Sequence, residues 1–323
     1  MIHCLKWFLG TEMVPAASSL HNMGSGDSAV DWSGLLKWSL QYTDGTTPSG
    51  TQPLSSSDVA WLHEAFASRV VDQVKSMRGY LKYLSSEVGT PVQELGEDVA
   101  SVVSGEETKV TMDGKLEAAE ELRDIVSQID LANDLPKVGG VPVLMELLAS
   151  QEPSLRAHGC GLWQTVAKDN PNGQAVALSA GALAPLMALM DNPSHPAVQA
   201  QAMGAVSALV QNCPPARTAF CDPERSRGVE FLVRVVDRAP AENATETERS
   251  GVLRVRRRAL FFLRTLLEAE DSAEPMDGTP LIDVASLAKD AGLGGACARL
   301  AGDPDIELRE GAAAVLQLLK LTQ

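Results

Sequence analysis

The histidines, cysteines and glycines could carry catalysis or bind a metal, but their spacing builds no familiar site. No His-Glu-x-x-His, Cys-x-x-Cys or Gly-x-Ser-x-Gly motif occurs. The run GLGG at 292–295 is similar to a nucleotide-binding loop, but no predicted strand precedes it, and we interpret it as a helix start. We therefore expect no enzyme, no metal site and no cofactor. The scattered histidines are His3, His21, His63, His158 and His195.

The cysteines and the apolar runs bear on the compartment. Five cysteines are an odd number, and Cys160 and Cys213 fall in apolar helical patterns, which is typical of small core residues in a reducing compartment. The apolar run at the start is too short for a signal peptide, and no run approaches the roughly 20 apolar residues of a membrane helix. The last residues, LKLTQ, are not a Lys-Asp-Glu-Leu type retention signal. We expect the cytosol, with the nucleus as a second compartment.

The charge is distributed unevenly. The net charge is −15, which argues against nucleic acid or an anionic membrane as a partner, because phosphate binding needs clustered Lys and Arg. Residues 217–264 are the exception, with 11 Arg against 7 acidic residues. This basic segment favours an acidic protein surface as partner. Its arginines could instead simply be solvated on helix faces.

A repeated pattern predicts the fold. Four segments align without gaps, and each places apolar residues at the spacing of an amphipathic helix. The first two lie 43 residues apart, which is the period of armadillo and HEAT repeats, with two or three helices per unit. A second apolar helix precedes each copy, opening near Gly139, Gly181, Arg227 and Ala291. The four aligned segments begin at Leu155, Val198, Val255 and Leu308.

These patterns predict an all-α protein, an armadillo-like helical solenoid of about four repeats over 115–323. A helix at 115–130 should cap its N-terminal end with an apolar face that includes Leu116, Leu122 and Ile129. The polar segment 240–251 is predicted to be a loop that lengthens the third repeat.

The first third of the chain has a different composition. Residues 1–57 are predicted to be a flexible extension that carries a short apolar island at 31–42. Residues 58–114 are predicted to form a helix followed by an acidic linker. Asp58 would cap that helix, whose stripe is Leu62, Phe66, Val70, Val74, Met77, Leu81 and Leu84.

A solenoid binds partners along the concave face that the last helix of each repeat lines. The polar residues off the apolar stripe are the candidates, and each could also be merely solvated. Trp163 lacks the Asn one turn later that importin-like solenoids use for basic peptides, so we expect it in the core. The candidates are Arg156, Gln164, Lys168, Gln199, Gln211, Asn212, Arg254, Arg257, Arg258 and Arg264.

Several of these segments resemble one family, the cytosolic nucleotide exchange factors of the Hsp70-binding-protein/Fes-one type. The segment LEAAEELRDIVSQIDLANDL at 116–135 is similar to the family signature. The island LLKWSLQYTDG at 35–45 is similar to the N-terminal Leu-Leu-x-Trp-Ser motif of fungal and plant members. The helix from Trp61 to Ser86 resembles the family's Trp-Leu-x-Glu-Ala helix. The resemblance covers nearly the whole chain from residue 31 onwards.

The resemblance implies a non-enzymatic partner of heat-shock protein 70. In that family the concave face binds the chaperone's nucleotide-binding domain and promotes ADP release. Ala132, Asn133 and Asp134 match the signature's contact segment, and Arg258 matches a basic residue of the third repeat. Lys168–Asp169 stands where relatives often carry Gln-Asn. The full set of predicted chaperone contacts is Ala132, Asn133, Asp134, Gln164, Lys168, Gln211, Arg254, Arg257 and Arg258.

The island at 31–42 resembles a release segment that occupies the chaperone's substrate-binding domain so that released client does not rebind. Packing of the island on the solenoid is the alternative. A generic armadillo adaptor and an endoplasmic-reticulum exchange factor remain rivals for the whole chain, which we expect to be a monomer. The predicted release residues are Leu35, Leu36, Trp38, Ser39 and Leu40.

Overall fold

The computed structural model describes residues 73–105, 107–270 and 282–321. The chain divides into two units, Met1–Arg69 and Val70–Gln323, and every described residue belongs to the second. The predicted extension 1–57, its island at 31–42 and the first part of the helix predicted from residue 58 therefore lie outside the described residues.

The described residues are helical throughout and contain no strand, apart from one isolated bridge between Pro91 and Lys109. This confirms the predicted all-α class, and each repeat has three helices. An N-terminal layer comes first: a helix at 73–85, η1 (Val92–Leu95), α4 (Glu97–Ala100) and α5 (Met112–Val126). The first repeat contains α6 (Ile129–Asp134), η2 (Leu135–Val138), α7 (Gly140–Ala149) and α8 (Pro153–Ala167). The second contains α9 (Pro171–Ser179), α10 (Leu183–Met190) and α11 (Pro196–Val210), and the third contains α12 (Pro214–Cys221), α13 (Gly228–Asp237) and α14 (Glu246–Glu270). The fourth contains α15 (Val284–Asp290), α16 (Leu293–Arg299), η3 (Leu300–Gly302) and α17 (Ile306–Leu321).

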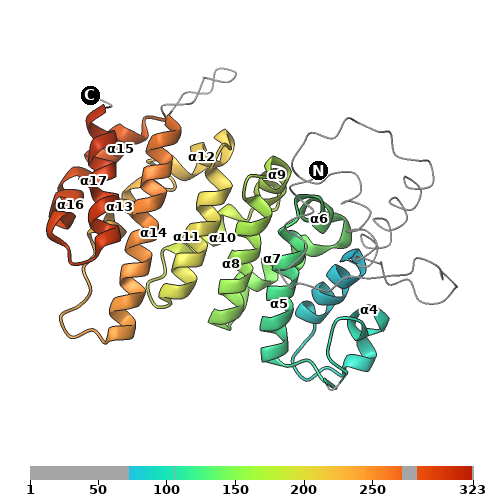
Figure 1. The fold of residues 1–323 in the computed structure, drawn as a ribbon. Coiled ribbons are helices and arrows are strands. Elements are labelled where there is room, and N and C mark those ends of the chain that lie inside the picture. The colour runs from blue at the N-terminus through green and yellow to red at the C-terminus, as the bar shows by residue number, and fades with distance from the viewer. Residues whose placement is uncertain (1–72, 106, 271–281, 322–323) are drawn as a thin grey trace, which may run out of the picture. The chain divides into compact units, whose positions relative to one another are not determined.

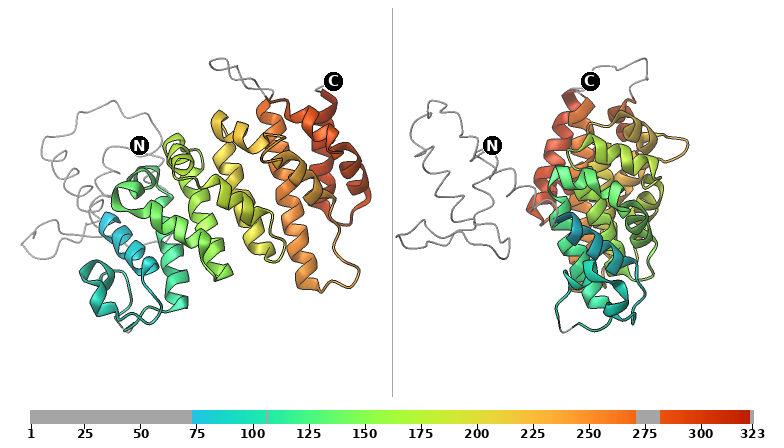
Figure 2. Two further views of the ribbon diagram at one scale, coloured as in Figure 1. Left: turned by 180° about the vertical axis from the view of Figure 1, so that it is seen from behind. Right: turned by 90° about the vertical axis from the view of Figure 1, so that its right-hand side faces the viewer.

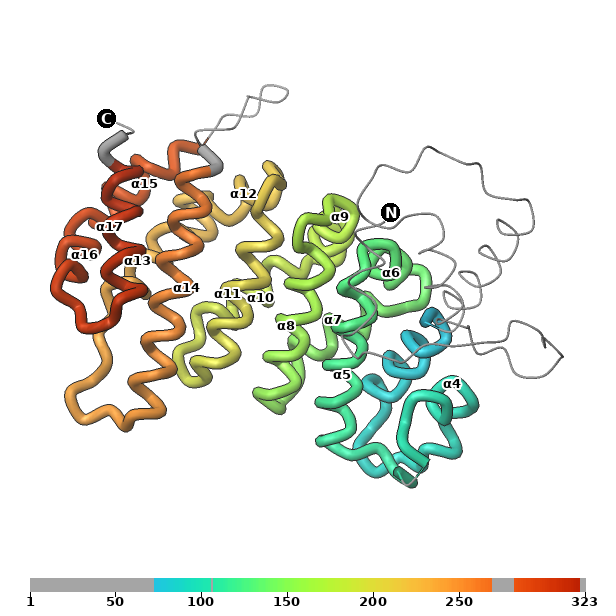
Figure 3. The backbone as a smooth tube through the Cα atoms, viewed as in Figure 1, coloured from blue at the N-terminus to red at the C-terminus, as the bar shows by residue number. Residues whose placement is uncertain are grey.

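The third helices of the repeats form a row. Figure 1 shows α5, α8, α11 and α14 side by side, and α17 packs on α14 at the far end. The second helices α7, α10 and α13 pack behind the third helix of their own repeat, as the rear view in Figure 2 shows. We call the outer side of the row the third-helix face. The tube in Figure 3 follows how each repeat returns the chain to this row.

The residues that begin the four aligned segments, Leu155, Val198, Val255 and Leu308, are all buried, which confirms the apolar stripe. Trp163 is also buried, as predicted. Their burial between neighbouring repeats explains why a sequence with few aromatic residues folds, since stacking many Ala and Leu side chains removes a large apolar area from water.

The turn into each second helix requires a left-handed backbone. Gly139, Gly181 and Gly292 have φ of 79°, 71° and 85°, a region that glycine enters without steric cost. Arg227 takes this position in the third repeat with φ of 50°. The GLGG run therefore lies at the start of the helix α16, as predicted. The left-handed turns explain the glycines near the starts of the second helices.

The predicted cap helix at 115–130 is wrong at both ends. The Thr111 hydroxyl accepts a hydrogen bond from Gly114 N at 3.0 Å, so α5 begins at Met112. The helix ends at Val126, and Ile129 is exposed in the separate helix α6. The segment IDLAND thus forms the first helix of the first repeat rather than the end of the cap.

The predicted loop at 240–251 is helical from Glu246. The Glu248 carboxylate accepts hydrogen bonds from both the backbone N and the hydroxyl of Thr245 at 2.8 Å, and Glu248 N donates back to that hydroxyl at 3.3 Å. This reciprocal pair is a capping box, and its Thr-x-x-Glu pattern was readable in the sequence. As a result α14 extends further toward its N-terminus than the other third helices do.

The acidic stretch 91–114 was predicted to be a linker, but it packs against the 73–85 helix. Val92, Val99 and Val110 are buried in this layer. The Tyr83 ring is fully buried, and its hydroxyl donates to the Glu107 carboxylate and accepts from Thr111 N. Burial is the main cause that raises the pKa of Tyr83, followed by its bond to Glu107. The layer therefore closes the N-terminal end of the solenoid.

Candidate functional site

Two of the predicted contact residues meet at the middle of the third-helix face. A methyl group on Gly204 of α11 would lie 2.6 Å from both Gln164 Oε1 of α8 and Arg258 Nη1 of α14. Three consecutive third helices therefore bring Gln164, Gly204 and Arg258 together, although the residues are far apart in sequence. Only a residue without a side chain leaves both polar groups in these positions.

Arg258 is held from the neighbouring repeat. Its Nη1 donates to Ala200 O at 2.8 Å and to Gln201 Oε1 at 3.4 Å. Burial, followed by the positive charge of Arg254, lowers the pKa of Arg258 below its ordinary value. The guanidinium is thus preorganised on the face, and it has no carboxylate partner among the described residues.

Arg257 does not join this group, and its predicted contact with the chaperone stays a prediction. Its guanidinium pairs with Asp305 and, at 3.3 Å, with Glu307, both at the start of the fourth repeat. The hydrogen bond from Arg257 is the main cause that lowers the pKa of Asp305. Arg257 therefore joins the third and fourth repeats and is already neutralised within the chain.

Arg156 and Gln199 were predicted on the face, but they cap second helices instead. Arg156 Nη1 donates to Ser150 O at 2.7 Å, and Gln199 Nε2 donates to Met190 O at 2.8 Å. Arg256 and Arg309, at the same position of repeats three and four, donate to Val236 O and Asp303 O. One repeat position thus satisfies carbonyls that the end of a helix leaves without partners. The signal was a polar residue directly after the first apolar residue of each aligned segment.

The contact segment on α6 offers less surface than predicted. Ala132 is 3% exposed and so presents almost no side-chain surface, and its predicted contact with the partner stays a prediction. The side-chain oxygen of Asn133 is buried and has no hydrogen-bond partner among the described residues, and Asp134 pairs with Lys137 at 2.6 Å. Asn133 and Asp134 are each partly exposed and remain the part of IDLAND that a partner can reach.

Ala132→Arg is expected to destabilise the first repeat by about 1–3 kcal/mol, because a long side chain must displace buried neighbours. Guanidinium denaturation followed by circular dichroism measures this effect. Asp130→Arg at an exposed position of the same helix is the control and should change stability little. Equal stability of the Ala132→Arg variant and the unaltered chain would show that the pocket around Ala132 is open.

Lys168 and Gln211 occupy equivalent positions at the ends of α8 and α11. Lys168 is exposed, and the Gln211 carbonyl accepts a bond of 2.7 Å from the buried Gln174. Asn212, another predicted face residue, adopts a left-handed φ of 54° in the turn after α11. These residues therefore lie at the edge of the row where first helices begin, not at the centre of the third-helix face.

Phe261 is a surface residue that the sequence reasoning missed. It is 58% exposed on α14, and the Arg264 guanidinium lies 5.3 Å from its ring centre. The residue occupies the repeat position that is glycine at 161 and 204. Its place off the apolar stripe was the signal that could have identified it.

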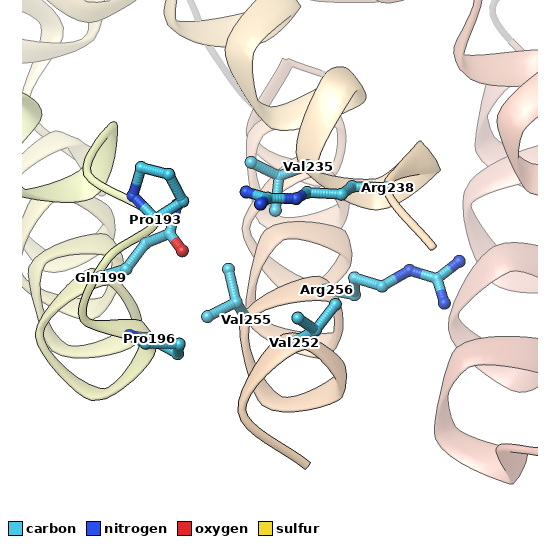
Figure 4. Close-up of a pocket in the computed structure, with 8 residues that line it drawn as sticks. All are labelled: Pro193, Pro196, Gln199, Val235, Arg238, Val252, Val255 and Arg256. Carbon is cyan, nitrogen blue, oxygen red and sulfur yellow. The ribbon is translucent and has the colours of Figure 1, made fainter. Parts of the chain in front are cut away.

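A small pocket between the second and third repeats serves packing rather than ligand binding. Figure 4 shows Gln199 and the two prolines on one side, and the α13 and α14 residues on the other. Arg256 extends from the pocket toward the fourth repeat, where it pairs with Asp303 at 3.5 Å. Gln199 and Arg256 thus already have partners within the chain. The pocket is lined by Pro193, Pro196, Gln199, Val235, Arg238, Val252, Val255 and Arg256.

Within the described residues, no three His, Cys, Asp or Glu side chains gather as a metal site would require. The buried thiol of Cys160 has its pKa raised to about 12, chiefly by burial, which makes it unreactive. No single described helix is long and apolar enough to cross a membrane, although the bent pair α9 and α10 passes on length and composition.

Two family models match the chain in succession. The model described as "Nucleotide exchange factor Fes1" matches residues 32–135, and the "SIL1/FES1/HPBP1 C-terminal domain" matches residues 131–247. They overlap at residues 131–135, and the second match ends at residue 247, just after α14 begins. Together the matches include the N-terminal layer, the first two repeats and the first two helices of the third.

Two relatives with assigned functions are similar to the chain. The "Hsp70 nucleotide exchange factor fes-1" of Neurospora crassa is 28% identical over 152 residues, which are 46% of this chain and 62% of that protein. The "Hsp70 nucleotide exchange factor FES1" of Cryptococcus neoformans var. neoformans is 25% identical over 277 residues, 78% of this chain and 69% of that protein. The aligned parts thus span about two thirds of these relatives.

Solved structures support the fold. An armadillo-repeats-only protein from Plasmodium falciparum has a TM-score of 0.53 at 15% identity, and the match covers 83% of this chain and 100% of that one. An engineered protein has a TM-score of 0.50 at 20% identity, covering 83% and 94%. At such identities the likeness concerns the fold alone, and it confirms the armadillo-like solenoid.

Proposed function

The chain belongs to the family of Fes1-type Hsp70 nucleotide exchange factors, and on that premise we propose that its third-helix face binds the nucleotide-binding domain of a heat-shock protein 70 and promotes release of ADP. The observation that carries the proposal is the match of both family models across the N-terminal layer and the first two repeats.

The proposed mechanism needs no chemistry by the chain itself. A partner that binds the ADP-free arrangement of the chaperone more tightly than the ADP-bound one shifts the equilibrium toward the free arrangement. By linkage, ADP must weaken binding of this chain by the same factor. The family is a class of co-chaperones rather than of catalysts. We propose that this chain acts in the cytosol.

The charge of the third-helix face supports this use. Among the described residues, no carboxylate pairs with Arg254 or Arg258, and the chain has a net charge of −15, so these arginines suit an acidic partner surface. Gln164 adds a neutral donor and acceptor beside Arg258. Lys168, Gln211, Asn133 and Asp134 extend the proposed contact toward the edge where the first helices begin.

The N-terminal island at 31–42 remains a predicted release segment. It lies outside the described residues, and its proposed role rests on the resemblance alone. Deleting 31–42 separates the two activities: ADP release should continue, whereas release of a labelled client peptide should slow.

The function is tested by stopped-flow release of a fluorescent ADP analogue from a cytosolic heat-shock protein 70. Saturating chain is expected to accelerate release by about tenfold or more, because coupling free energies between sites typically reach 1–3 kcal/mol. The same chain heated beyond its melting transition is the control. If the chain binds the chaperone without accelerating ADP release, it is an armadillo adaptor rather than an exchange factor. If it neither binds nor accelerates release, the chaperone is not its partner.

A further inference from the structure

One exposed stripe of α14 combines cations with an aromatic ring. Arg254, Arg258 and Phe261 follow at intervals of four and three residues, so they lie on one side of the helix. Among the described residues, Phe261 is the only aromatic side chain among the exposed large apolar ones. Arg264 stacks on its ring. We call Arg254, Arg258, Phe261 and Arg264 the arginine–phenylalanine stripe.

Within the described residues, Arg254 and Arg258 lack acidic partners. Three other arginines of α14 have them: Arg256 pairs with Asp303, Arg257 with Asp305, and Arg264 with Glu268 at 3.2 Å. No described carboxylate pairs with Arg254 or Arg258, and like charges four residues apart on a helix repel one another. Carboxylates of a bound partner protein would relieve this repulsion.

Phe261 is 58% exposed on α14. Its repeat position is occupied by Gly161 in α8 and Gly204 in α11, so the third repeat carries an aromatic ring where the first two carry no side chain. An exposed aromatic ring flanked by guanidinium groups has the composition of an interface anchor, since aromatic and Arg residues dominate binding energies. Covering it would remove a large apolar area from water.

The surface continues toward the start of α14. An open groove lies between the start of α11 and the first turns of α14, and Arg254 is one of its lining residues. The others are Pro196, Ala197, Glu246, Thr247, Glu248, Ser250 and Gly251. From Gly251 to Arg264 the helix rises about 20 Å, at 1.5 Å per residue. The extra turns that the Thr245 capping box adds thus lengthen the contact surface.

We propose that the arginine–phenylalanine stripe anchors the chaperone, with Phe261 entering an apolar depression on the nucleotide-binding domain whose rim carries carboxylates for Arg254 and Arg258. The proposal rests on the proposed function and adds the chemistry of the surface contacted. We assign the chaperone to the stripe because the stripe is continuous with the proposed chaperone contact: Arg258 belongs both to the stripe and to the central group with Gln164 and Gly204.

The apolar half is tested with Phe261→Ala in the full chain. Its dissociation constant for nucleotide-free heat-shock protein 70, measured by calorimetry, should rise about tenfold or more, as for an interface anchor. The melting temperature should not fall, since the ring is exposed. Val88→Ala removes an apolar side chain of similar exposure, 56%, from the N-terminal layer and should leave binding unchanged.

The charged half is tested with Arg254→Glu against Arg225→Glu. Both variants change the net charge equally, and Arg225, in the turn between α12 and α13, has an 89% exposed side chain. Arg254→Glu should raise the dissociation constant about tenfold and reduce its salt dependence, whereas Arg225→Glu should do neither.

Each outcome decides the matter. Suppose that the unaltered chain accelerates ADP release from the chaperone, but the Phe261→Ala and Arg254→Glu variants bind the chaperone as tightly as the unaltered chain does. The stripe proposal is then overturned and the proposed function stands. If the unaltered chain does not bind the chaperone, both are overturned. Weakened binding by both variants, with intact controls, supports the stripe.

Discussion

Arg256→Met is expected to destabilise the solenoid by about 3–5 kcal/mol, the cost of removing one partner from a buried ion pair. The Arg256 side chain is 7% exposed; its Nε donates to Val236 O at 3.0 Å, and it pairs with Asp303 at 3.5 Å. The substitution leaves a helix-end carbonyl and a carboxylate without their partner in the seam between repeats three and four. Guanidinium denaturation followed by circular dichroism measures the loss.

Arg254→Met is the matched control. It makes the same substitution two residues earlier in the same helix, but Arg254 is exposed and has no acceptor within the part of the chain that the structure describes, so stability should change by less than about 0.5 kcal/mol. Equal denaturation midpoints for the two variants would contradict the structural role assigned to Arg256. A loss confined to Arg256→Met would also explain why a polar residue recurs at this position in all four repeats.

Gly204→Ala is expected to weaken binding of heat-shock protein 70 about tenfold or more without lowering stability. The added methyl group would lie 2.6 Å from Gln164 Oε1 and Arg258 Nη1, so both proposed contact residues must move at once. Alanine is about 1 kcal/mol more favourable than glycine inside a helix, which opposes any loss from the moved side chains. Calorimetric binding and thermal melting measure the two effects separately.

Gly161→Ala supplies the control at the same repeat position of α8. There the added methyl group meets only the Arg123 side chain, at ordinary contact distances of 3.7 and 3.9 Å. This variant gains the same helix propensity and should bind the chaperone as the unaltered chain does. Unchanged chaperone binding by the Gly204→Ala variant would show that Gln164 and Arg258 are not part of the contact surface.

The periodic features were predictable because they are local. The apolar stripe recurs at the helical interval, and the left-handed turn favours glycine, so Leu155, Val198, Gly139 and Gly181 already indicated stacked helical repeats. The capping box at Thr245 is equally local, but the polar composition of 240–251 favours a loop and so masks the Thr-x-x-Glu pattern. The break between α5 and α6 had no comparable signal, since the apolar pattern continues across it to Ile129.

By itself, the sequence determined the class of the fold, its repeats, the burial of Trp163 and the resemblance that the family models later matched. Only the tertiary structure decided which polar residues face a partner. Arg256, Arg257 and Arg258 are adjacent in sequence, yet one caps a helix, one joins the next repeat, and one lies on the third-helix face. Successive residues of a helix point in directions about 100° apart, so the neighbouring repeats, rather than residue type, assign each guanidinium its role.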